Sequence, residues 1–189
     1  KTIATVTGSQ SAQTTFTDNH AGVYGGGIGV RMKAKLVIKW TSLTSNISQV
    51  GPGGGVAAIG DNEAFRLQAL GALGGSTLSI EDSVLGPHNE SRGGRAVGAI
   101  GGGLFVQGQE SVCSLNRVTI AGNDATLEGG GVAVAIMAKL RAGHCNVVGN
   151  HADEKGCGMY VTLFPQVVMD GGFIRENDAD NEGGGAHAT

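Results

Sequence analysis

The chain has 189 residues, of which 35 are glycine, against a usual share of about 7% in soluble proteins. The glycines follow no three-residue period and only 3 prolines accompany them, which excludes collagen, while a hydrophobic content of 40% excludes a disordered glycine linker. The net charge is −3 without any lysine or arginine cluster, so we expect no nucleic-acid partner, and no apolar run approaches the ~20 residues of a membrane-spanning helix.

The chain is organised by repeated glycine and asparagine signatures. Glycine triplets or near-triplets begin at Gly25, Gly53, Gly101, Gly129, Gly156 and Gly183. An asparagine precedes each, usually in an apolar-x-x-Asn-x-Ala signature, at Asn19, Asn46, Asn89, Asn123, Asn150 and Asn177. Three of the asparagine steps are 27 residues, and those leading to Asn89 and Asn123 are 43 and 34 residues. The sequence therefore predicts about seven coils of one ~27-residue unit, with insertions near residues 60–75 and 91–99.

Within each unit the apolar residues alternate with a period of two, which is typical of strands. The residues three and five positions after each first glycine are apolar, beginning with Ile28 and Val30. A second alternating segment precedes the asparagines, as at Leu36 and Ile38. Short strands at this period predict an all-β fold, a right-handed parallel β-helix whose stacked coils bury their inner faces. We expect residues 1–189 to form a single β-helix that is a fragment of a longer protein.

The asparagine and glycine columns have structural interpretations. Asparagine tolerates the left-handed backbone of a tight turn, and stacked amides hydrogen-bond from coil to coil. The expected structural ladder consists of Asn19, Asn46, Asn123, Asn150 and Asn177. Glycine allows the backbone to bend sharply where the next strand begins.

These signatures resemble the repeats of the chlamydial and algal polymorphic membrane proteins, which are marked by Phe-x-x-Asn and Gly-Gly-Ala-[Ile/Leu/Val] tetrads. The segment Phe16–Asn19 matches the first tetrad, and the other copies carry Leu, Ile or Val in place of Phe. The segment Gly25–Ile28 has glycine where the family has alanine. The resemblance implies a surface-displayed β-helix used in adhesion, and hence an extracellular or cell-surface location.

The outer face of the strand after each glycine triplet is unusually apolar. With Phe65 of the first insertion, the candidate interface residues are Ala57, Ile59, Phe65, Phe105, Ala133 and Tyr160. Flat apolar strips of this kind mark interfaces, so the expected partners are other protein subunits or the rest of the same chain. The first insertion is predicted to hold a short helix through Leu70, either a flap over its own coil or a docking element. The second contains Arg92 and Arg95 and is either a plain loop or a contact for surface glycans or a partner.

Residues 27 apart become neighbours on the rod. Two outward columns result, one of Asp124, His151 and Asp178 and one of Glu128, Lys155 and Glu182. Their alternating charge predicts inter-coil ion pairs, with a metal or acid–base site as the alternative for the first column. No cofactor or metal site is expected, beyond weak calcium binding by acidic turns that contain Asp153, Glu154 and Asp180.

Two further residue types bear on location and chemistry. Cys113, Cys145 and Cys157 lack the spacing of a zinc site and are interpreted as buried thiols. Asn89 begins the sequon Asn-Glu-Ser and is the candidate glycosylation site, because the other sequon asparagine, Asn46, belongs to the ladder.

Three functions remain open from the sequence. The preferred hypothesis is a non-enzymatic extracellular or cell-surface β-helix with a structural, assembly or adhesive role. The alternatives are a carbohydrate-active β-helix, such as a polysaccharide lyase or hydrolase, and a glycan-binding module. An enzyme of this class needs paired carboxylates or a calcium site with a basic residue, and no catalytic residue is assigned from the sequence.

Overall fold

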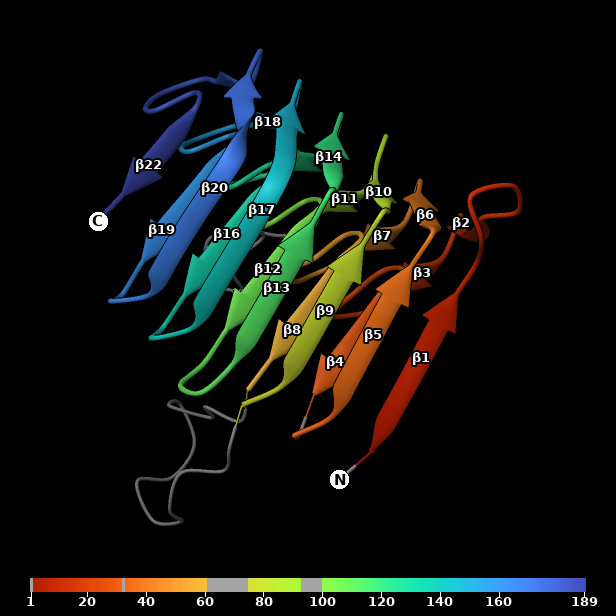
Figure 1. Ribbon diagram of the computed structural model, residues 1–189. Helices are drawn as coiled ribbons and strands as arrows, with labels where there is room; N and C mark the ends of the chain where they lie inside the picture. The colour runs from red at the N-terminus through yellow and green to blue at the C-terminus, as the bar shows by residue number, and fades with distance from the viewer. Residues whose placement is uncertain (1, 32, 61–74, 93–99) are drawn as a thin grey trace.

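The computed structural model is a right-handed parallel β-helix (Figure 1). It describes residues 2–31, 33–60, 75–92 and 100–189. Every strand-to-strand pairing within these residues is parallel, and the strands stack in four columns along the rod, two of which merge into one sheet. No helix occurs in the described part of the chain, and the helix predicted around Phe65 falls outside it.

The strands are assigned to columns by their pairing. The first column contains β1 (Ile3–Thr7), β5 (Lys35–Lys39), β9 (Thr77–Glu81), β13 (Val112–Asn116) and the first halves of β17 (Lys139–Val148) and β20 (Gln166–Arg175). The second contains β2 (Thr14–Thr17), β6 (Thr41–Thr44), β10 (Val84–Leu85), β14 (Thr119–Ala121) and the second halves of β17 and β20. The third contains β3 (His20–Ala21), β7 (Ile47–Ser48), β11 (Glu90–Ser91), β15 (Asp124–Ala125), β18 (His151–Ala152) and β21 (Asp178–Ala179). The fourth contains β4 (Ile28–Arg31), β8 (Val56–Ile59), β12 (Leu104–Gln107), β16 (Val132–Ala135), β19 (Met159–Thr162) and β22 (Ala186–Ala188).

The described residues place six strands in each column, whereas about seven coils were expected from the repeat length. The difference arises at the two insertions, because the asparagine steps of 43 and 34 residues together exceed two 27-residue units by almost one coil. Asn46 and Asn89 are 43 residues apart, yet their side chains are hydrogen-bonded as neighbours. One coil therefore uses the length of a coil and a half.

The interior is filled by the alternating positions that the sequence indicated. Val56, Leu104 and Val132 follow their glycine triplets by three residues, and all are fully buried in the main core cluster. Ile38 and Ile80 fill the same core from the first column. Similar side chains stack on one another from coil to coil, which buries a continuous apolar interior that no single coil could form.

The asparagine ladder is present and includes one residue more than predicted. The side-chain amide of each asparagine donates to Oδ1 of the next at 2.9 Å, in the order Asn19, Asn46, Asn89, Asn123, Asn150 and Asn177. From the second member onward, each amide also donates to a backbone carbonyl of the preceding coil, as Asn150 does to Ile120. Asn46, Asn89, Asn123 and Asn150 are fully buried, so the ladder is satisfied within the interior.

The left-handed backbone lies one residue away from its predicted position. The asparagines do not adopt it; the residue before each one does, at Asp18, Ser45, His88, Gly122, Gly149 and Glu176. The asparagine is therefore required for its side chain rather than for its backbone conformation. The glycine prediction is confirmed, because the first glycine of every triplet has positive φ, from 59° at Gly156 to 76° at Gly53.

Candidate functional site: a pocket on the outer face of the fourth column

The apolar strip is buried rather than open to a partner. Ala57, Phe105 and Ala133 are at most 1% exposed, and Ile59 and Tyr160 are 8% exposed. They form a second buried cluster, separate from the core, against which the partly buried Ile100 and Ile136 pack. These five residues are therefore covered within the chain, which corresponds to the second of the two expected partners, the rest of the same chain. Phe65, the sixth candidate, lies outside the described residues.

A pocket of about 360 Å³ opens beside this covered strip. It is lined by Ile100, Phe105, Gln107, Leu127, Glu128, Ala135, Ile136, Glu154, Tyr160, Thr162 and Leu163. The strands β12, β16 and β19 supply its floor, and the turns before and after them supply its walls. These strands lie behind β13, β17 and β20 in Figure 1. The lining combines apolar walls with two carboxylates, an amide and two hydroxyl groups, which is the usual composition of a small-ligand site.

The two carboxylates differ from ordinary surface acids. Glu128 and Glu154 are both partly buried. Burial raises the pKa of Glu128, the hydrogen bond from the Tyr160 hydroxyl lowers it, and the charge of Glu154 raises it again. The net shift of the Glu128 pKa is upward, so its charge is poorly solvated beside the apolar walls of the pocket.

The column that contains Glu128 continues away from the pocket. Glu128, Lys155 and Glu182 lie at the same position of three successive coils. Parallel β-bridges join Glu128 to Lys155 and Lys155 to Glu182. The Lys155 ammonium lies 3.0 Å from Glu182, so one of the predicted inter-coil ion pairs is formed. In the next coil of the same column, the ring of His187 stacks on Tyr160 with centroids 5.9 Å apart and an interplanar angle of 9°. Tyr160 therefore lies between Ala133 of the preceding coil and His187 of the following coil.

The rim of the pocket is apolar and carries an unusual backbone. Ile136 and Met137 occupy one turn and Leu163 and Phe164 the turn stacked on it, and all four have φ between 50° and 63°. Such angles are uncommon for large side chains and for β-branched isoleucine above all. Met137 is 44% exposed and Phe164 is 88% exposed. Two adjacent turns thus display apolar side chains at the mouth of the pocket.

The predicted Asp124–His151–Asp178 column stacks in register but does not gather as a site. The structure instead brings His151 together with Asp153 and Asp180, with one possible ligand atom from each within 4.8 Å of the others. His151 Nε2 is 3.4 Å from Asp153 Oδ1. Both aspartates are exposed, which is common for acidic groups that bind no ion.

The glycosylation prediction for Asn89 is wrong for the folded chain. Its amide nitrogen, the atom to which a glycan would be attached, is buried and donates to both Leu43 O and Asn123 Oδ1. The sequon serine, Ser91, is also buried and donates to Gly51 O at 2.8 Å. In most other coils this position is alanine, so the sequon results from a ladder asparagine followed by a small inward residue.

The three cysteines are free and buried, as predicted. Burial raises the pKa of Cys113 beyond the ordinary range, and burial raises that of Cys157 to about 12. These thiols are therefore protonated near neutral pH and are poor nucleophiles and poor metal ligands.

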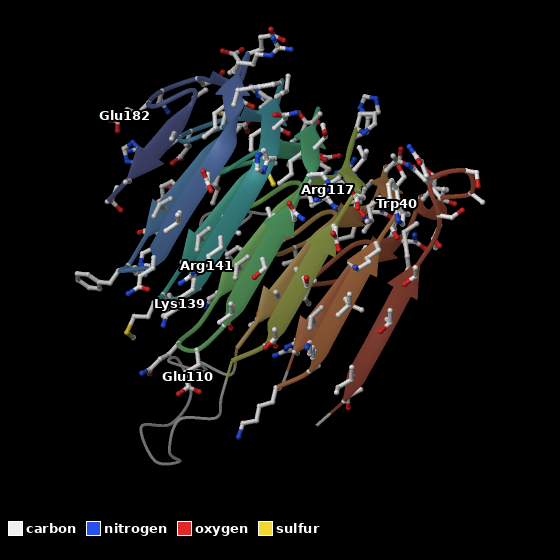
Figure 2. The ribbon with its side chains drawn as sticks, in the orientation of Figure 1. Trp40, Glu110, Arg117, Lys139, Arg141 and Glu182 are labelled. Carbon is white, nitrogen blue, oxygen red and sulfur yellow. The ribbon has the colours of Figure 1, made fainter. Side chains whose placement is uncertain are left out.

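An ion-pair network that the sequence did not indicate lies at the corner between the first two columns. Arg117 contacts Glu81 at 2.7 Å and Asp82 at 2.6 Å, and Lys39 contacts Glu81 at 2.5 Å. Figure 2 shows Arg117 and Trp40 at this corner, apart from Glu182 at the C-terminal end of the rod. The network crosses both irregular asparagine steps, of 43 and 34 residues, so the constant spacing of 27 could not reveal it.

Comparison with protein-family models, curated proteins and solved structures finds no match for this chain. The resemblance to polymorphic membrane proteins therefore stays a prediction. Among the described residues, no helix is long and apolar enough to cross a membrane.

Proposed function

We propose that the protein is a non-enzymatic, extracellular or cell-surface β-helix with an adhesive role, and that it binds glycans in the pocket lined by Glu128 and Tyr160. The observation that carries this proposal is the composition of the pocket. Aromatic and aliphatic side chains form its floor and walls, and Gln107, Thr162 and the two carboxylates offer hydrogen bonds to hydroxyl groups. Sugar rings present both an apolar face and a ring of hydroxyl groups, and this lining suits both.

The rest of the molecule supports a structural role for the rod. The buried asparagines are committed to the ladder, and the buried serines at positions 48, 83 and 91 donate to backbone carbonyls. The polar groups of these residues are therefore engaged in holding the coils together. Ligand recognition on such a solenoid is expected on outward surfaces, which is where the pocket lies.

The experiment that tests the proposal is calorimetric titration of the full chain with neutral oligosaccharides, with two matched glutamine variants. Gln107→Leu removes an amide from the pocket lining, while Gln166→Leu removes one from an exposed position outside it. We expect binding to the wild type and to Gln166→Leu, and at least a several-fold weaker affinity for Gln107→Leu. Failure of every oligosaccharide to bind the wild type would refute the glycan proposal.

A carbohydrate-active enzyme is the second candidate, and one observation favours it. The pocket holds two carboxylates, and the pKa of one, Glu128, is raised, as in the general acid of a glycoside hydrolase. Release of reducing ends from the bound oligosaccharide during prolonged incubation, abolished by Glu128→Gln, would favour the enzyme. Intact oligosaccharide would favour the adhesive role.

A further inference from the structure

We propose that two stacked turns at the mouth of the pocket dock the rod on a bilayer that contains anionic lipids. The turns comprise residues 136–138, between β16 and β17, and residues 163–165, between β19 and β20. Figure 1 shows them side by side along one edge of the rod. This inference goes beyond the glycan proposal and does not depend on it.

These turns expose three large apolar side chains. Met137 is 44% exposed, Leu163 53% and Phe164 88%. An aromatic side chain left almost wholly in water contributes little to the stability of the fold, and clusters of exposed apolar groups mark protein or membrane interfaces. Because these side chains project from an edge of the rod, a bilayer can receive them directly, whereas a protein partner would need a matching groove.

The fold does not require apolar residues at this corner. Both turns hold two consecutive residues at positive φ, a conformation for which glycine and asparagine are preferred. The equivalent turn of the preceding coil, between β12 and β13, contains Gly108, Gln109 and Glu110 instead, and its Gly108 and Glu110 have positive φ. Formation of the turn therefore does not explain why the next two coils carry large apolar side chains there.

Cations lie next to the apolar turns. Lys139 and Arg141 are exposed on β17, directly after the first turn, and Figure 2 shows both on the side of the rod that carries the turns. Their neighbours in the strand register are all uncharged, namely Val112, Ser114, Gln166 and Val168. Glu110, at the turn of the preceding coil, is the acidic group of this corner. A lysine or arginine near an anionic bilayer is attracted to the headgroups, so these two cations favour anionic over neutral lipid.

The backbone of the first turn is suited to apolar surroundings. The N–H groups of Ile136 and Met137 donate to Thr162 O and Leu163 O, at 3.1 and 3.0 Å. Backbone donors that enter the apolar part of a bilayer must keep such partners. The same two bonds join the turns to each other, so their side chains form one anchor rather than two independent ones.

The test is flotation of the full chain with two kinds of vesicle, phosphatidylcholine alone and phosphatidylcholine mixed with phosphatidylserine. Neither contains a sugar, so the result is independent of glycan binding. Two matched pairs of variants are compared: Phe164→Ser with Phe173→Ser, and Arg141→Gln with Arg175→Gln. Phe173 and Arg175 are exposed in the second half of β20, away from the turns.

We expect the wild type to bind the mixed vesicles several-fold more tightly than phosphatidylcholine alone. Loss of the inserted ring in Phe164→Ser should weaken binding to the mixed vesicles about tenfold or more. Loss of one cation in Arg141→Gln should weaken it about fivefold. The two control variants should bind as the wild type does.

Three results would overturn the inference. The wild type may fail to float with the mixed vesicles, in which case the exposed turns serve a protein partner instead. Equal losses in Phe164→Ser and Phe173→Ser would mean that binding does not use these turns. Equal binding to both kinds of vesicle would remove the role of anionic lipid. Matching thermal melting curves establish that each variant is folded.

Discussion

Asn150 and Asn177 are joined by two hydrogen bonds to one oxygen: the backbone N–H and the side-chain amide of Asn150 both donate to Oδ1 of Asn177, at 2.9 Å each. Asn123 makes the same pair of bonds to Asn150. Each interior member of the ladder is therefore a donor to one neighbour and an acceptor for the other. Loss of one asparagine affects groups on both sides.

The first prediction concerns an interior member of the ladder. Asn150→Leu leaves the backbone N–H of Asn123 and one N–H of its side-chain amide without a partner in the buried interior, and it removes the amide that donates to Ile120 O. Each buried unsatisfied group costs about 1–3 kcal/mol, so we expect a loss of about 3 kcal/mol or more in urea unfolding. Asn19→Leu is the control, because Asn19 is exposed and only donates, and its loss should cost about 1 kcal/mol or less. Equal losses for the two variants would contradict the ladder account.

The second prediction concerns the glycine that packs on the ladder. A Cβ atom on Gly131 would lie 2.7 Å from Gly158 O and 2.9 Å from Asn150 Nδ2, although its backbone angles are ordinary. Gly131→Ala should therefore destabilise the protein by about 1–3 kcal/mol through overpacking.

Gly22 provides the matched control for this change. A Cβ atom there would meet no heavy atom within 4 Å. Gly22→Ala should alter the free energy of unfolding by about 0.5 kcal/mol or less. If the two variants had the same free energy of unfolding, the overpacking account would be wrong, because the coils would then separate readily enough to accept a methyl group at Gly131.

The fold was predictable because repetition gives several independent copies of each signal. Inner positions such as Val56 and Val132 recur at fixed offsets from glycine, and their burial follows directly. Features that depend on the backbone of a turn or on one irregular coil were harder to predict. The left-handed residue lies before the asparagine, and Asn89 belongs to the ladder although its flanking residues depart from the signature.

The site was only partly predictable. The sequence indicated the outward column that contains Phe105 and Tyr160 and allowed for its coverage by the same chain, but it did not indicate that a pocket would border it. Ile100 and Leu127 line this pocket from turns outside the repeated signature, so no spacing rule places them there. Glu128 was noted as a member of a charged column, and only the burial around it distinguishes it from Glu182.

The third prediction concerns acid sensitivity at the corner network. Hydrogen bonds from Lys39 and Arg117 lower the pKa of Glu81, and the hydrogen bond from Arg117 lowers that of Asp82. When folding lowers the pKa of a carboxyl group, the charged group stabilises the folded protein at any pH above the pKa of the unfolded chain. This stabilisation is lost as the pH falls through the pKa of the folded state. Arg117→Ala should therefore reduce the melting temperature modestly at neutral pH and have little effect in strong acid.

Arg175→Ala is the control for this charge change. Arg175 is exposed, lies over the ring of Phe173, and is 3.6 Å from Glu176. No comparable pH-dependent difference is expected for this variant. Melting curves measured from neutral to acidic pH at low salt test both variants, and a constant difference for Arg117→Ala across that range would argue against the network as the source.

The fourth prediction has the opposite sign and concerns Glu128. Burial raises the folded-state pKa of Glu128 above its ordinary value of 4.5, and the facing groups Tyr160, Glu154, Lys155 and His187 modify it. The folded protein therefore binds the proton more tightly than the unfolded chain does, and stability is lost as the pH rises from the ordinary pKa to the raised one. Glu128→Gln avoids this loss, so its melting temperature should exceed that of the wild type at neutral pH.

The pH dependence of this difference is the decisive measurement. Below the ordinary pKa of Glu128 the wild-type side chain is neutral in both states, so the advantage of Glu128→Gln should disappear there. A variant that is less stable than the wild type at neutral pH without ligand would mean that a cation of the chain, with Lys155 the nearest candidate, already neutralises Glu128.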